Sequence, residues 1–230
     1  TFSWAYQLVY KSAWDLNISF NIFPSNFIFF LEDQDTLPAF LKIPAILADL
    51  GIAYMVFLFA KRLVGSGNRN LPLLATLLVL FNPAFFYNSA YWGQIEAVPV
   101  FFILASFYLL LYLKQPVLAA MIFTLALLTK QTAIIFVPLF AVFYFARVGM
   151  KRTFTSLAAS VAVFWLAFLP FHEAGSLVTF PFEVYINKIQ TGSSSDFVTD
   201  HAFNLWALLT GLGKIPDSTL FWLGLSFREW

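Results

Sequence analysis

The chain has 230 residues, of which 60% are hydrophobic, 20% aromatic and only 11% charged, and its mean hydropathy is +0.79. Soluble domains are about 45–50% apolar and about 25% charged, so this composition excludes a soluble enzyme, a disordered tail, a collagen and a disulfide scaffold. The net charge of +1 provides no polybasic surface for nucleic acid, and the absence of cysteine leaves no disulfide framework and no thiolate metal site.

Six apolar stretches are long enough, or nearly long enough, to cross a bilayer as helices, which takes about 20 apolar residues. In chain order they are residues 41–60, 71–91, 97–113, 116–129, 132–147 and 153–171. Residues 1–40 predict an interfacial or partial membrane segment, because Pro24 interrupts a possible span. Residues 219–230 predict the start of a further membrane helix. We therefore expect an all-α fold, a polytopic transmembrane helical bundle of about 6–8 membrane helices with its core at residues 41–171.

The segment between the last two predicted spans, residues 172–218, is rich in Gly, Ser, Thr, Asp and His. Connections longer than about 12–15 residues are usually functional or disordered. Counting spans places this segment on the same side of the membrane as Glu96, so we predict a long external loop.

Basic side chains gather in two loops, and counting the spans between the loops puts both on one side, which the positive-inside bias makes cytoplasmic. These residues are Lys61, Arg62, Arg69, Arg147, Lys151 and Arg152. Acidic side chains gather on the opposite side, namely Glu32, Asp33, Asp35, Glu96, Glu173, Glu183, Asp196 and Asp200. Lys114 is expected to reach the cytoplasmic interface, whereas Lys130 falls on the predicted external side.

The densest polar cluster in an apolar setting runs from Asn82 to Glu96. Asn82-Pro83 should loosen the helix, because Pro removes a backbone donor. If the helix nevertheless continues, Ser89, Trp92 and Glu96 share one face. Gln94 and Glu96 are candidate site residues, because carboxylates at membrane depth are rare and usually functional, although a solvated helix cap is the alternative. For Trp92 an aromatic-belt role is the preferred interpretation.

Lys130-Gln131 forms a second cluster, on the side where the positive-inside bias does not favour a cation. An ammonium group there, beside an amide and two hydroxyls, would suit a phosphate or pyrophosphate at the membrane surface. A structural ion pair between Lys130 and Glu96 is the alternative.

Lys42 and Asp49 form a third cluster, because residues seven apart lie on one face of a helix. A carboxylate two turns into a span is costly unless it meets a partner or water. The pair therefore predicts either a polar cleft or a purely structural contact with a neighbouring helix.

His201 and Asn204 could donate hydrogen bonds to a sugar hydroxyl, with Trp206 as a stacking surface, or could belong to a loop helix that docks on the membrane. One His beside one Asp is a weak metal site, because transition metals usually take three or four ligands. No metal ligand set and no cofactor are identified. The chain also lacks a Gly-rich phosphate loop, a nucleophile elbow and an HExxH motif.

Several of these segments, in this order, resemble the GT-C superfamily of membrane glycosyltransferases, and in particular bacterial proteins similar to GPI mannosyltransferase 2. The resemblance covers residues 40–140 well and residues 200–227 loosely. The segments that carry it are Lys42-Ile43-Pro44 with Asp49, Asn82-Pro83, Trp92-Gly93-Gln94-Ile95-Glu96, Leu127-Leu128-Thr129-Lys130-Gln131 and Ala202-Phe203-Asn204-Leu205-Trp206.

The resemblance implies a mannosyltransferase in a multi-pass protein, in the bacterial cell membrane rather than the endoplasmic reticulum. The donor would be a dolichyl- or polyprenyl-phosphate-linked sugar, the acceptor a glycan or glycolipid, and transfer would occur on the extracytoplasmic face with inversion. The substrate-binding residues would then be Lys42, Asp49, Trp92, Gln94, Glu96, Lys130, Gln131, His201 and Asn204. Glu96 stands where the relatives usually carry Asp, which keeps the acid and lengthens its reach by a methylene group.

In this superfamily the general base is an Asp, or an Asp-Glu pair, in the first external loop before a Tyr-Pro-Pro-like segment, and neither feature occurs in this chain. Because the chain begins at Thr1 without a basic leader, we interpret it as the interior of a longer polytopic protein, with the general base upstream of Thr1. The alternative is a secondary transporter that uses Asp49, Glu96 and Lys130 as coupling residues, although no internal repeat supports it. A non-catalytic scaffold would leave these charges unexplained.

Overall fold

The computed structural model forms two compact units, Thr1–Ala167 and Phe168–Trp230. The described residues are 2–22, 24–32, 36–65, 70–172, 176–192, 215–216, 218–222 and 224–226.

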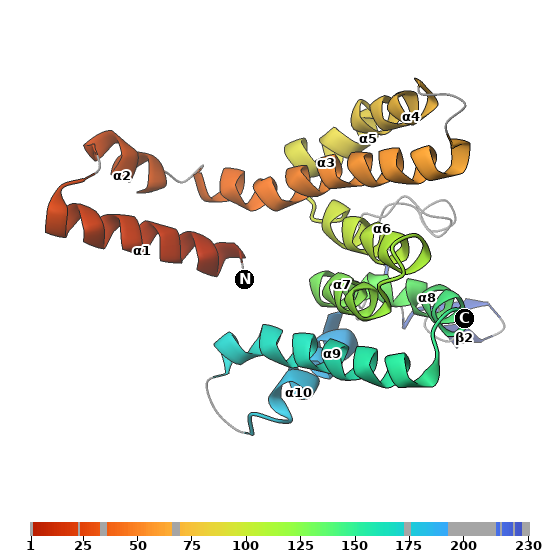
Figure 1. The fold of residues 1–230 in the computed structure, drawn as a ribbon. Coiled ribbons are helices and arrows are strands. Elements are labelled where there is room, and N and C mark those ends of the chain that lie inside the picture. Colours follow the sequence, from red (N-terminus) through yellow and green to blue (C-terminus); the bar gives the residue numbers. More distant parts are fainter. Residues whose placement is uncertain are drawn as a thin grey trace. The chain divides into compact units, whose positions relative to one another are not determined.

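The described part of the first unit is helical throughout (Figure 1). Its elements are α1 (Phe2–Phe20), α2 (Ser25–Glu32), α3 (Thr36–Val64), α4 (Asn70–Leu80), α5 (Pro83–Phe86), the π-helix η1 (Tyr87–Tyr91), α6 (Ala97–Leu111), α7 (Pro116–Thr129), the 3-10 helix η2 (Gln131–Phe136), α8 (Val137–Phe145) and α9 (Met150–Phe168), whose last residue begins the second unit.

Three helical runs are long and apolar enough to cross a membrane, namely Thr36–Val64, Asn70–Tyr91 and Met150–Phe171. Three shorter apolar helices accompany them, Ala97–Leu111, Pro116–Thr129 and Gln131–Phe145. These six elements correspond to the six stretches predicted from the sequence, and the helical membrane-bundle prediction is confirmed.

The helix α3 is longer than the predicted stretch at residues 41–60, and it continues through Pro44. Its last turn carries Lys61 and Arg62, whose positive charges complement the negative end of the helix dipole. Gly65 follows in the left-handed conformation, with φ +66°, which is a common way to end a helix.

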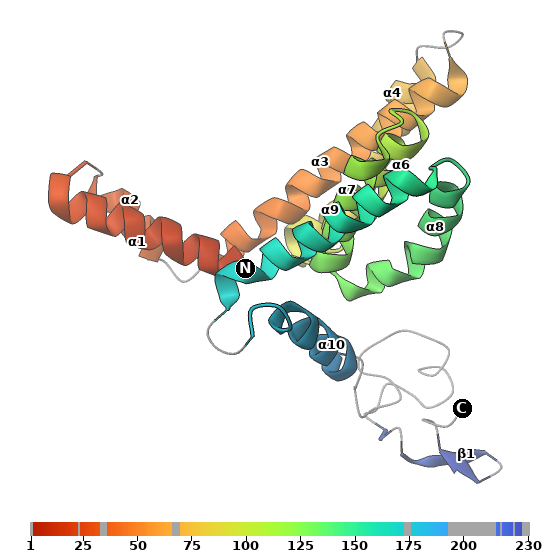
Figure 2. The same ribbon diagram turned by 60° about the horizontal axis from the view of Figure 1, so that its bottom comes forward.

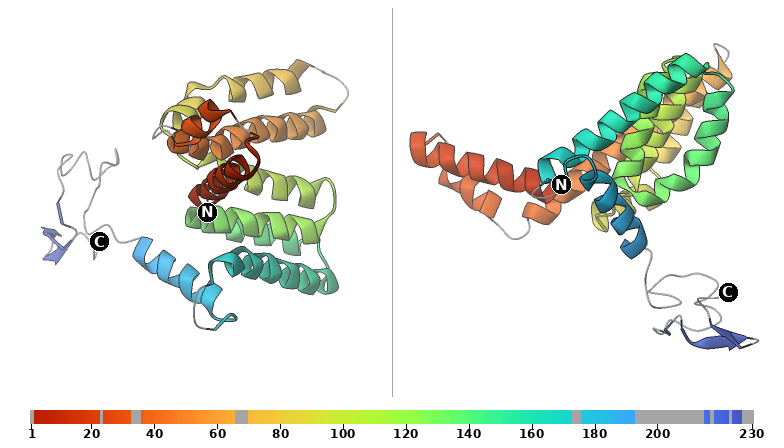
Figure 3. Two further views of the ribbon diagram at one scale, coloured as in Figure 1. Left: turned by 90° about the vertical axis from the view of Figure 1, so that its left-hand side faces the viewer. Right: turned by 90° about the horizontal axis from the view of Figure 1, so that it is seen from below.

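The helix α6 is central, because α3 packs on one side of it and α7 on another, while α4 packs on α3 (Figures 1 and 3). Gly51 of α3 permits a close approach, since a Cβ atom there would lie 2.6 Å from the ring of Phe101 in α6. Between α7 and α8, the rings of Phe123 and Phe140 stack with centroids 4.3 Å apart. Lipid chains are as apolar as these rings, so such contacts stabilise the bundle by close packing, with an aromatic pair contributing about 0.5–1.5 kcal/mol.

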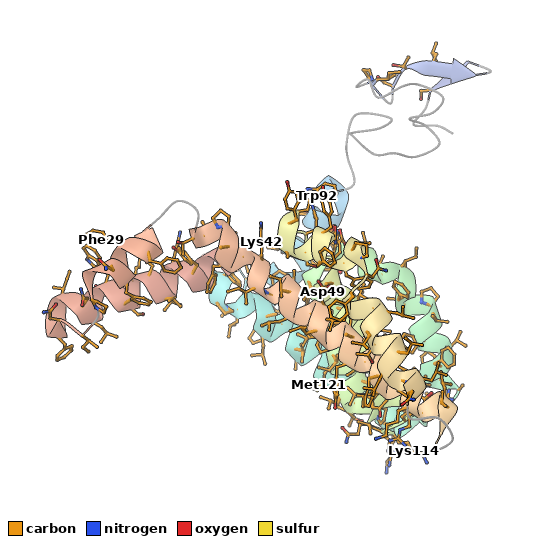
Figure 4. All side chains as sticks on the ribbon, turned by 90° about the horizontal axis from the view of Figure 1, so that it is seen from above. Phe29, Lys42, Asp49, Trp92, Lys114 and Met121 are labelled. Atoms are coloured by element: carbon orange, nitrogen blue, oxygen red, sulfur yellow. The ribbon has the colours of Figure 1, made fainter. Side chains whose placement is uncertain are left out.

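The residues of the two predicted basic loops lie at one end of this unit. Arg62 Nε lies 3.4 Å from the Tyr108 hydroxyl near the end of α6. Lys114, Arg147, Lys151 and Arg152 line a single cavity beside the same end of α6. Figure 4 shows Lys114 at the opposite end of the helices from Lys42 and Trp92. Arg69 is outside the described residues, and the assignment of the basic end to the cytoplasm stays a prediction.

The second unit contains the 3-10 helix η3 (Leu169–Phe171), α10 (Phe180–Gly192) and two short antiparallel strands, β1 (Leu220–Trp222) and β2 (Leu225–Ser226) (Figure 2). The start of a membrane helix that the sequence predicts at residues 219–230 is therefore not found in the described part of that segment. Gly224, with φ +76°, reverses the chain between the strands, which an apolar run alone does not reveal.

Candidate active site

The polar segment 82–96 contains two irregular helices. As the sequence predicts, Asn82-Pro83 interrupts the run: α4 ends at Leu80, and Asn82 Oδ1 accepts a hydrogen bond from Ala84 N at 3.0 Å as the cap of α5. The π-helix η1 then closes with a bond from Trp92 N to Tyr87 O at 2.8 Å. Such π-turns are frequent at functional sites, because they displace side chains from the regular helical register.

The chain turns sharply after η1, at Gly93, whose φ is +77°. Ser89 and Trp92 lie before this turn, in and at the end of the π-helix, where Ser89 is 1% exposed and Trp92 is 66% exposed, and the turn places Glu96 beyond them. The common face predicted for Ser89, Trp92 and Glu96 is therefore not formed. The exposure of Trp92 agrees with its preferred interpretation as an aromatic-belt residue.

Lys42 connects α3 to this turn. Its Nζ donates a hydrogen bond to the backbone carbonyl oxygen of Tyr91 at 3.0 Å. A Cβ atom on Gly93 would lie 3.2 Å from Lys42 Cε, so the missing side chain at this position makes room for the lysine. The Lys42 ammonium thus remains at the polar turn while its aliphatic carbons pack on the backbone.

Asp49 lies two helical turns further along α3 than Lys42. Its side chain also meets the polar segment, where it faces Ser89. Within the described residues, neither Asp49 Oδ1 nor Ser89 Oγ has a hydrogen bond of normal geometry, and both atoms are shielded from solvent. Buried polar atoms are normally bonded, so these two side chains, which face each other, are placed to bond either to each other or to another group. Lys42 and Asp49 therefore approach η1 from the same side of α3, as their spacing predicts.

Glu96 and Lys130 form an ion pair between the start of α6 and the end of α7. Both positions suit the charges, because the amino end of a helix attracts an anion and the carboxyl end a cation. The side chains are 31% exposed for Lys130 and 45% for Glu96, so water and ligands can reach the pair. Lys130 itself adopts an extended backbone, with φ −153°, which separates α7 from η2.

The structure describes only some of the remaining candidate site residues. Gln94 precedes Glu96, and its backbone N–H bonds to Asn88 O at 2.9 Å. Gln131 begins η2 directly after Lys130, and both glutamines are partly buried. His201, Asn204 and Trp206 lie outside the described residues. Among the described residues, no group of three or more His, Cys, Asp or Glu side chains could hold a metal ion.

In a comparison with protein families, residues 37–226 match the model of glycosyltransferase family 87. This range covers well over half of the chain. The chain belongs to glycosyltransferase family 87. Comparison with curated proteins found no match, and comparison with solved structures also found none. The family match supports the glycosyltransferase part of the resemblance and does not confirm the resemblance to GPI mannosyltransferase 2.

This family 87 glycosyltransferase is an integral membrane protein, and its described candidate site residues lie at the end of the helices opposite the basic cavity. Lys42, Asp49, Glu96 and Lys130 are all predicted from the sequence. Ser89 is predicted only to share a helix face, and the Tyr91 carbonyl is not predicted at all. Ser89 gave one usable signal, because it is a small polar residue in an aromatic segment. The Tyr91 carbonyl gave none, since its exposure depends on the π-helix and on the turn at Gly93.

Proposed function

We propose that this family 87 glycosyltransferase transfers a hexose, with mannose the favoured sugar, from a polyprenyl-phosphate-linked donor to a glycan or glycolipid on the extracytoplasmic face. The observation that supports this proposal is the Glu96–Lys130 ion pair, which water and ligands can reach. Glu96 belongs to the polar segment 82–96, and Lys42 and Asp49 contact the same segment. For convenience we call Lys42, Asp49, Ser89, Glu96 and Lys130 the polar cluster.

Lys130 would stabilise the leaving group. Transfer breaks the bond between the sugar and the lipid phosphate, so negative charge grows on the phosphate oxygens as the reaction proceeds. A fixed ammonium group lowers the energy of that transition state more than the energy of the bound donor. In the free protein Glu96 holds Lys130 in place, and on donor binding the phosphate would replace Glu96 as its partner.

The acidic members would orient hydroxyl groups. A carboxylate released from Lys130 accepts hydrogen bonds from sugar hydroxyls, and Gln94 offers both a donor and an acceptor beside it. Asp49 Oδ1 and Ser89 Oγ, which lack normal hydrogen bonds within the described part of the chain and are shielded from solvent there, would bind a further hydroxyl only once donor binding opens this contact. The resemblance implies that the proton of the acceptor is removed by an Asp outside the polar cluster, so no member of the polar cluster is assigned as general base.

The test uses the full-length protein reconstituted into vesicles, with a polyprenyl-phosphate mannose donor carrying a radioactive sugar. We expect label in a glycan or glycolipid product, and less with the matching glucose donor. Movement of intact donor or free sugar across the membrane without a new glycosidic bond would contradict the proposal and would favour the transporter. Transfer from a sugar nucleotide in place of the lipid donor would also contradict it.

A further inference from the structure

A cavity of about 590 Å³ lies at the end of the first unit that carries the basic loops. The end of α6, the turn into α7 and the start of α9 line it. Four of its ten lining residues are cations, Lys114, Arg147, Lys151 and Arg152, and the other six are uncharged. Such a cavity attracts anions, because no lining carboxylate opposes the four positive charges.

The four cations have no anionic partner within the described part of the chain, where the Glu96–Lys130 contact is the one ion pair. Arg147 stacks on the Phe143 ring, with 5.6 Å between its guanidinium carbon and the ring centroid, which leaves its donors available. Gathering like charges around one cavity is unfavourable unless an anion compensates them. A positive-inside signal alone needs cations in the loops but does not need them around a common cavity.

Lys114 is held in this cavity at a conformational cost. Its φ is +55°, in the left-handed region that Gly or Asn usually occupies where a helix ends. The first turn of α9 contributes as well, since Met150, Lys151 and Arg152 line the cavity. Backbone N–H groups in a first turn lack partners inside the helix, and the positive end of the helix dipole favours an anion there.

An apolar groove continues along α9 from the cavity. It is lined by Phe154, Leu157, Ala158, Val161, Ala162 and Trp165, which share one face of the helix. Met150 and Lys151 of the cavity lie one turn before Phe154 on that face. Phe154 is 66% exposed and Leu157 is 60% exposed, so this face is open to hydrocarbon chains.

We propose that the cavity binds the phosphate headgroup of an anionic membrane phospholipid, with an acyl chain of the same lipid along the groove of α9. Basic pockets between membrane helices on the cytoplasmic side are typical sites for anionic headgroups. A lipid headgroup and a free phosphate ion would present the same phosphate group to the cavity. The adjoining groove favours the lipid, because a free ion would make no use of it. This site is separate from the polar cluster and does not depend on the proposed sugar transfer.

The experiment measures ligand binding to the purified full-length protein by native mass spectrometry. The probes are dioctanoyl phosphatidylglycerol, dioctanoyl phosphatidylcholine and inorganic phosphate. We expect the anionic lipid to bind about tenfold more tightly than the zwitterionic one, and each neutralised cation to weaken that binding about fivefold. The variants are Lys114→Asn, which keeps a residue that tolerates positive φ, Lys151→Gln and Arg152→Gln.

The matched control is Lys61→Gln, which removes an exposed cation that does not line the cavity. Ala158→Trp fills the groove and so distinguishes a lipid headgroup from a free phosphate ion. If a lipid occupies the site, this variant should lose phosphatidylglycerol binding, while binding of inorganic phosphate should be unaffected. Thermal unfolding confirms that each variant is folded. Equal binding of both lipids, equal weakening by Lys61→Gln, or no effect of Ala158→Trp would each overturn the proposal.

Discussion

The ammonium group of Lys130 contacts the carboxylate of Glu96, although 34 positions separate the two residues in the chain. The contact joins the end of α7 to the start of α6, and both side chains keep access to water. An exposed ion pair contributes only about 0–1 kcal/mol to stability, so stability alone is a weak reason for a pair at this place. A role in ligand binding explains its position better.

Exchanging the two charges separates these roles. Glu96→Lys with Lys130→Glu restores the ion pair in the opposite direction but places each charge at the helix end that disfavours it, so the double variant should regain only part of the stability that the single variants lose. Transfer should not return, because the leaving phosphate would face a carboxylate. The measurement is sugar transfer beside thermal unfolding for the double variant and both single variants. Recovery of transfer in the double variant would show that the pair is structural.

Gly93→Ala tests whether Lys42 matters at the turn. An alanine in the left-handed region costs about 1–2 kcal/mol, and its Cβ would also displace Lys42. Gly65→Ala is the matched control, because Gly65 has a similar φ of +66° but nothing within 4 Å of the added atom. Both variants should lose similar stability, and only Gly93→Ala should lose transfer. Similar transfer by the two variants would exclude Lys42 from the site.

Ser89→Ala tests the buried hydroxyl that faces Asp49. Ser89 Oγ has no hydrogen bond of normal geometry in the described part of the chain, so its removal should leave stability unchanged or raise it by about 1 kcal/mol. Transfer should fall, because the hydroxyl is proposed to bind the substrate. The control is Ser106→Ala, a buried serine that bonds to the Ile103 carbonyl oxygen within α6. A large loss of stability without loss of transfer would make Ser89 structural.

Much of this arrangement follows from the sequence, because hydrophobic length and a few breaks determine it. The six apolar stretches, the interruption at Asn82-Pro83 and the gathering of the basic loops at one end are all read from residue type and spacing. The paired α3 residues Lys42 and Asp49 follow from helical periodicity.

Other features depend on tertiary contacts that a sequence pattern does not contain. The π-helix changes the register between Ser89 and Trp92, and the left-handed Gly93 separates both from Glu96, whereas a regular helix would have aligned all three. Whether Lys130 meets Glu96 depends on the packing of α6 on α7. Lys114 is also a lysine at the end of an apolar helix, but it has a left-handed backbone and lines the basic cavity. Lys61 is therefore the better comparison for Lys130.

Gly51→Ala tests the packing of α3 on α6. Alanine is favoured over glycine within a helix by about 1 kcal/mol, but the new Cβ would lie 2.6 Å from the Phe101 ring. Overpacking of this kind costs about 1–3 kcal/mol, so the variant should unfold at a lower temperature. Gly149→Ala, with nothing within 4 Å, should be neutral. Adding Phe101→Leu should recover part of the loss, and unchanged stability of Gly51→Ala alone would contradict the close approach of the helices.

The most direct test of the central proposal compares Lys130→Met with Lys61→Met in the full-length protein. The measurement is sugar transfer from a polyprenyl-phosphate mannose donor, normalised to folded protein. Each variant removes one lysine from an end of an apolar helix, but only Lys130 lies in the polar cluster. Loss of one preorganised charge donor lowers the rate by about 10²–10³, so Lys130→Met should lose nearly all transfer while Lys61→Met retains it. Equal rates for the two variants would contradict the role of Lys130 at the leaving phosphate.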